Sequence, residues 1–159
     1  MRGKIMDSYA TTILARIDDA KKQQEQQTVR QNHLEEQAYL YFNNLKEKAK
    51  SSVEELKNAE ERYSQLRHTT MSPMAFRVQN MGKPYATVEV KLGDAHLDFV
   101  VKTARHPGES SAQLQGSIVL ALDSDGNLIV RGKKGNDDPT ELRTVDQAMD
   151  FLFKPVVGV

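Results

Sequence analysis

The sequence predicts an α+β protein: a long amino-terminal helix, then a five-stranded antiparallel meander sheet, then a carboxy-terminal helix. Three observations support this. Residues 4–72 contain neither glycine nor proline. From residue 76 the apolar spacing alternates as in strands, and near the end of the chain it becomes helical again. We therefore expect a helical arm for oligomerisation over residues 1–70 and a small α+β sheet domain over residues 71–159.

The helical region carries a heptad seam, because its apolar positions recur at alternating steps of four and three residues. A shift of register by four residues after Leu45, a stutter, continues the seam to Leu66. Such a helix needs a partner, since packing supplies most of its stability. The seam residues expected at a helix interface are Ile13, Ile17, Gln24, Gln27, Gln31, Leu34, Tyr41 and Leu45.

The middle of the seam is polar, with three successive glutamines, and it has three interpretations. A continuous helix could pair with a second copy through buried Gln layers that set register and oligomeric state. The chain could instead fold back near Thr28 to Asn32, because Thr28 and Val29 are β-branched and Asn32 precedes Glu35 at capping-box spacing. A third interpretation is a solvated stretch without a role. We favour the continuous, coiled-coil-like helix over the helical hairpin.

The five strands are expected at residues 76–81, 85–92, 95–104, 114–122 and 127–133. Short turns make neighbouring strands antiparallel. A two-residue tip at Gly93 and Asp94 would place Glu89 opposite Asp98, and "DSDGN" predicts a turn with Gly126 in the left-handed conformation. Strands 114–122 and 127–133 are apolar on both faces, which predicts helices covering both sides.

The last helix has two candidate starts, at Asp138-Pro139 and at Thr144, where Gln147 completes a capping box. Pro155 is expected to end it.

One group of side chains has the composition of a metal site. Strand alternation places His96 and Asp98 on one face with Glu89 across from Asp98, and an imidazole with two carboxylates can bind a divalent ion. The competing interpretation, which we prefer, is a solvated sheet face, because a flat strand surface lacks the groups that orient metal ligands. A metal-dependent enzyme or metal-binding domain is therefore an alternative function. Our expectation is that the protein binds no metal or other cofactor.

Charge argues against general affinity for nucleic acid. Lys plus Arg and Asp plus Glu both number 22, whereas phosphate binding requires a basic excess or stripe. A candidate basic patch without interleaved aromatic residues leaves nucleic-acid association as a further alternative; it comprises Lys102, Arg105, Arg131, Lys133 and Lys134.

The favoured function is a non-catalytic protein–protein interaction module of the adaptor, chaperone or inhibitor type. With no cysteine, thiolate chemistry is excluded, and no nucleophile elbow or phosphate-binding glycine loop is present, so we expect no enzymatic activity. The start lacks a secretory signal and no apolar run is long enough to span a membrane. We expect a cytoplasmic homo-oligomer, preferably a dimer, that also binds another protein.

Overall fold

The computed structural model describes residues 2–82, 85–106 and 112–158, with side chains from Ser8 onward, and it confirms an α+β fold. The sheet has seven strands instead of the expected five. In chain order the elements are α1 (Arg2–Ala59), the 3-10 helix η1 (Glu61–Tyr63), β1 (Leu66–Ser72), β2 (Ala75–Asn80), β3 (Tyr85–Leu92), β4 (His96–Ala104), β5 (Ala112–Leu122), β6 (Leu128–Lys134), β7 (Thr140–Glu141) and α2 (Val145–Val157).

The chain forms two compact units, Met1–His33 and Leu34–Val159, which meet within α1. The sequence instead predicts a boundary at residues 70/71. We call the first unit the arm and the second the sheet unit. The carboxy-terminal part of α1 belongs to the sheet unit because its apolar side chains form part of that unit's core.

Within α1 the helix continues through the polar middle of the seam. The hydroxyl of Thr28 donates to the backbone carbonyl of Gln24 at 2.9 Å, four residues earlier, as threonine does inside a helix. The continuous helix is therefore confirmed, and the chain does not fold back near Thr28 to Asn32.

The carboxy-terminal end of α1 differs from the expectation. The helix ends at Ala59, and Glu60 has an extended backbone (φ −137°, ψ 124°). Tyr63 and Leu66 are buried, as the seam predicts, but Tyr63 lies in η1 and Leu66 begins β1. Their burial is reached without helical geometry, so the continuation of the helix to Leu66 was wrong.

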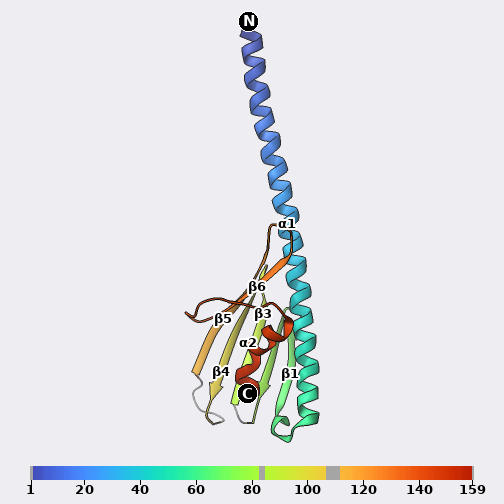
Figure 1. The fold of residues 1–159 in the computed structure, drawn as a ribbon, viewed down its shortest axis with the longest axis vertical. Coiled ribbons are helices and arrows are strands. Elements are labelled where there is room, and N and C mark those ends of the chain that lie inside the picture. Colours follow the sequence, from blue (N-terminus) through green and yellow to red (C-terminus); the bar gives the residue numbers. More distant parts are fainter. Residues whose placement is uncertain (1, 83–84, 107–111, 159) are drawn as a thin grey trace. The chain divides into compact units, whose positions relative to one another are not determined.

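The sheet is an antiparallel meander in which strand order follows the sequence from β1 to β7, as expected (Figure 1). The two unpredicted strands lie at its edges. Only Leu66 is buried in β1, and β7 has two residues, both exposed. Edge strands with so little apolar alternation give a weak sequence signal.

The register of the β3–β4 hairpin differs by two residues from the prediction. Leu92 lies opposite Leu97, and the backbone N–H of Gly93 donates to the carbonyl of His96 at 2.8 Å, so the tip is Asp94 and Ala95. A shift of two residues keeps each side chain on its predicted face but changes its partner. Glu89 therefore lies opposite Val100 instead of Asp98.

A single hydrophobic core lies on one face of the sheet, under α1 and α2 (Figure 1). The ring of Phe76 in β2 shows this directly, since its centroid lies 5.6 Å from that of Phe42 in α1 and 6.1 Å from that of Phe153 in α2. The expectation that β5 and β6 are covered on both sides was wrong. On the opposite face of β5 Val119 is 51% exposed, because both helices pack on the same side.

Thr144, one of the two predicted starts, caps helix α2 at its beginning, but the helix does not end at Pro155 as predicted. The hydroxyl of Thr144 accepts a hydrogen bond from the backbone N–H of Gln147 at 3.1 Å. Pro155 lies inside the helix, which continues to Val157 and ends where Gly158 takes the left-handed conformation (φ 72°). A proline this close to the end removes one backbone donor without preventing a final turn.

Candidate interaction surfaces

The arm exposes its apolar seam. From Ser8 to His33 every side chain is exposed except that of Ile13, which is half-buried. Ile17 is 46% exposed, and the three seam glutamines are exposed as well. An isolated helix gains little stability in water from propensity alone, so this seam is a candidate surface for a helical partner.

Three of the predicted interface residues lie instead at the core of the sheet unit. Leu45 is completely buried there, and Leu34 and Tyr41 pack against the same core. Phe42 is fully buried, so the packed stripe of α1 runs through Phe42 with Tyr41 at its margin. Of the eight seam residues, the arm therefore offers Ile13, Ile17, Gln24, Gln27 and Gln31 for contact with another molecule.

Tyr41 has a distinct environment within the sheet unit. Its hydroxyl is buried and has no hydrogen-bond partner among the described residues, and burial raises the pKa of Tyr41 to about 12. The ring lines a hollow of about 300 Å³ together with residues 128–130 of β6 and residues 141–145, which lead into α2. With its pKa raised in this way, the hydroxyl stays neutral at physiological pH.

Within the sheet unit both helical segments pack on one side of the sheet, and we call the opposite side the open face. It consists of the outward side chains of the seven strands, which alternate with the buried ones. Its charged groups are six basic and three acidic side chains, apart from His96. These are Arg67, Arg77, Lys91, Lys102, Arg131 and Lys133, with Glu89, Asp98 and Glu141.

The residues considered for a metal site lie on the open face but do not converge. Glu89 lies opposite Arg77, with a carboxylate-to-guanidinium distance of 3.6 Å. His96 Nε2 lies 3.2 Å from Asp98 Oδ2. Over the described part of the chain, no three His, Cys, Asp or Glu side chains are grouped so that they could hold a metal ion.

The candidate basic patch is divided between the faces. Lys102, Arg131 and Lys133 lie on the open face. Lys134 points to the helix side, where its amino group lies 4.7 Å from the centroid of the Phe151 ring and burial lowers the pKa of this lysine. Arg105 follows the end of β4 and is exposed.

Arg67 and Arg77 are open-face residues that sequence reasoning missed. Arg67 lies in β1, which was predicted as helix, so its face could not be assigned. For Arg77 the alternation of β2 provides the signal, since Phe76 and Val78 on either side of it are buried.

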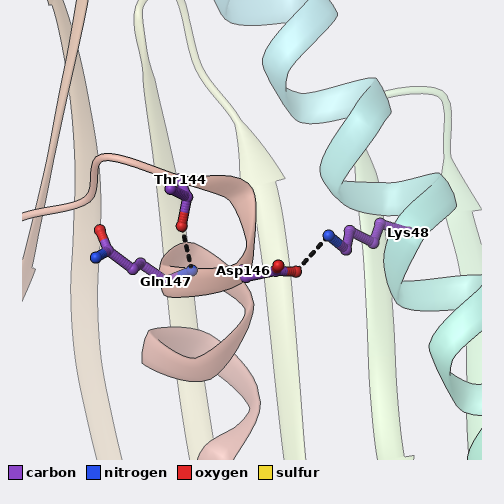
Figure 2. A network of polar contacts seen from close by, with 4 residues as sticks. All are labelled: Lys48, Thr144, Asp146 and Gln147. Atoms are coloured by element: carbon purple, nitrogen blue, oxygen red, sulfur yellow. Dashed lines mark hydrogen bonds and ion pairs between the residues drawn. The ribbon is translucent and has the colours of Figure 1, made fainter.

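On the other face of the sheet, a small group of polar contacts surrounds the start of α2 and links it to α1 (Figure 2). Lys48 of α1 forms an ion pair with Asp146 in the first turn of α2, next to the Thr144 cap. Gln147 completes the cap, because its side-chain oxygen accepts from the backbone N–H of Arg143 at 2.7 Å. This network holds the start of α2 against α1.

No helix in the described part of the chain is long and apolar enough to cross a membrane. Comparison of the chain with protein-family models, with curated proteins and with solved structures finds no match.

Proposed function

We propose that this protein is a non-catalytic protein–protein interaction module. Its arm pairs with the arm of a second copy, and its sheet presents the open face to another protein. The two surfaces lie in separate units, so one can serve assembly while the other serves recognition.

The observation that carries this proposal is the exposed, continuous seam of the arm. Ile13 and Ile17 lie four residues apart, at consecutive seam positions of a helix whose described arm side chains are almost all exposed. Pairing two such helices removes these apolar side chains from water, at roughly 25 cal/mol per Å² of apolar area. A second copy supplies an identical seam, so a dimer satisfies both chains at once.

The glutamines explain how pairing could be specific. Gln24, Gln27 and Gln31 follow the apolar residues in the same seam. Polar residues at core positions of a coiled coil lower its stability but favour the register in which they meet each other. The arm would therefore form a moderately stable, register-defined dimer instead of an open-ended bundle.

The experiment is sedimentation velocity on two matched single variants. Ile17→Glu places a charge in the seam, and Val29→Glu makes the same kind of change at an exposed position (69%) outside the seam. We expect Ile17→Glu to shift the protein to monomer, while Val29→Glu sediments like the original chain. Equal behaviour of the two variants, with unchanged circular dichroism, would contradict pairing through the seam.

A further inference from the structure

We propose that the open face binds a protein partner whose contact surface combines acidic and apolar side chains. The inference deepens the proposed function, on which it rests, by stating the chemistry of the partner that the sheet recognises. It draws on charge, on exposed apolar area and on the size of the face.

The first argument is charge. The three acidic side chains of the open face each have a cationic or histidine neighbour: Arg77 beside Glu89, His96 beside Asp98, and Arg143 at 3.5 Å from Glu141. Five basic residues of the face form no ion pair with any residue that the structure describes. They are Arg67, Lys91, Lys102, Arg131 and Lys133. This surplus favours an acidic partner.

The second argument is the apolar area among these charges. Val119 in β5 is 51% exposed, although β-branched residues at the centre of a sheet are usually packed. Val100 and Ile129 also point outward and are half-buried. Val119 lies directly opposite Arg131, so an exposed aliphatic side chain and a cationic one are neighbours on adjacent strands. A partner surface that carries both apolar and acidic groups would match both kinds of side chain.

The third argument is size. The six longer strands, β1 to β6, have 7, 6, 8, 9, 11 and 7 residues. With about 3.3 Å per residue along a strand and about 4.8 Å between neighbouring strands, they present a face of roughly 600 Å². A standard protein complex buries about 800 Å² on each partner. Contact over the whole face would bury roughly 1,200 Å² on the two partners together, which is the lower end of the standard range and suits a specific contact of modest affinity.

A nucleic acid fits this surface less well. The only outward aromatic side chain on the described strands is Tyr85, at the start of β3, so the face has no platform on which bases could stack. Glu89 and Asp98 lie on the central strands β3 and β4, where they would repel a phosphate backbone. A protein surface can match both signs of charge.

The test uses the full chain and two probes of equal net charge. One is a fluorescent peptide of about 20 residues with the repeat Glu-Glu-Leu, comparable to one side of a standard interface. The other is a single-stranded oligothymidylate. Binding is measured by fluorescence anisotropy at low and physiological salt for the original chain and three variants.

The variants separate charge from apolar contact. The face variant carries Lys91→Gln, Lys102→Gln and Lys133→Gln. Its matched control removes the same charge from the helices through Lys50→Gln, Lys57→Gln and Lys154→Gln. Val119→Thr keeps the β-branched shape but replaces a methyl group with a hydroxyl.

We expect salt-sensitive binding of the peptide that weakens roughly tenfold in the face variant, which is the effect of losing three exposed charge contacts. Val119→Thr should weaken it by a smaller factor, and the control should leave it unchanged. The proposal is overturned if the peptide does not bind, if the control weakens it as much, or if the oligonucleotide binds more tightly than the peptide in a face-dependent way.

The same peptide titration on Ile17→Glu distinguishes this inference from the pairing of the arms. Binding by a monomeric Ile17→Glu variant, lost in the face variant, supports the open face whether or not the arms pair. A dimeric original chain without peptide binding overturns only the inference about the open face.

Discussion

The side-chain amide of Asn80 in β2 donates a hydrogen bond to the backbone carbonyl of Val156 near the end of α2, over an N–O distance of 3.1 Å. Asn80 is 2% exposed and is the one buried polar side chain among the described residues. Its oxygen accepts from the backbone N–H of Gly82 at 2.9 Å. Since the last carbonyls of a helix lack partners within it, Asn80 fixes the end of α2 on the sheet.

Replacing this residue should be costly. Asn80→Leu leaves the Val156 carbonyl and the Gly82 N–H without their partner, and each unsatisfied buried group costs about 1–3 kcal/mol. We expect a loss of about 2–4 kcal/mol in the free energy of unfolding, measured in urea. Tyr63→Phe, which removes a single 2.8 Å hydrogen bond to the Val157 carbonyl, should cost about 1 kcal/mol. Equal losses in the two variants would contradict the special role of Asn80.

Gly132 in β6 makes room for an aromatic ring. A Cβ atom at this position would lie 2.6 Å from two ring carbons of Phe151, well inside van der Waals contact. Gly132→Ala should therefore destabilise the protein by about 1–3 kcal/mol through overpacking, as shown by a lower thermal midpoint. The control is the double variant Gly132→Ala with Phe151→Leu, which removes the ring carbons that the added Cβ would meet and should destabilise the protein by less than the two single changes add up to. A neutral Gly132→Ala would show that the ring can move aside.

The cap of α2 should matter more than the neighbouring ion pair. Thr144→Ala removes the hydroxyl that accepts from Gln147 and should cost about 1 kcal/mol. Lys48→Gln breaks the ion pair with Asp146, whose side chain is 81% exposed, and should cost less than about 0.5 kcal/mol. Urea unfolding at two salt concentrations separates them: only the effect of Lys48→Gln should shrink at high salt. The reverse order of costs would refute this ranking.

His68 should make stability depend on pH. Burial, with the nearby charge of Lys50, lowers the pKa of His68 from its ordinary value of 6.5, and Glu47 partly opposes this. The unfolded chain therefore binds a proton at higher pH than the folded chain does. The contribution of His68 to the free energy of unfolding is therefore fully present above pH 6.5. It is lost as the pH falls from there toward the lower pKa of the folded state.

The check for this prediction is urea unfolding between about pH 5 and pH 7.5. His68→Phe preserves an aromatic ring next to Phe76, where the centroids lie 5.3 Å apart, and removes the titration. It should flatten the pH dependence relative to the original chain. The exposed His106, changed to Gln, serves as the control and should leave the slope as it was. If the free energy of unfolding of His68→Phe still depended on pH as in the original chain, other titratable groups would be responsible for that dependence.

The sequence predicts those parts of the fold whose signals are local. Heptad spacing predicts α1, strong alternation predicts the five strands β2 to β6, and Gly126 does take the left-handed conformation (φ 83°). The helix end and β1 were missed because Tyr63 and Leu66 continue the helical spacing, while tertiary packing buries both in another geometry. Local periodicity cannot distinguish two geometries that bury the same residues.

The surfaces were predicted less well than the elements. The cross-strand partners on the open face depend on register, and the exposure of that face depends on which side α2 packs. Both are set by long-range contacts that one sequence does not reveal. The Gly93 hairpin shows this, because an error of two residues gave Glu89 the wrong partner. Leu45 likewise belongs to a seam in the sequence, but only the structure shows that its own chain buries it.

Pairing through the arm is tested most directly by the molar mass of the full chain in solution. Light scattering over a range of protein concentrations should give about twice the 17.9 kDa of one chain, falling toward one chain only on dilution. A mass of 17.9 kDa at every concentration would contradict it.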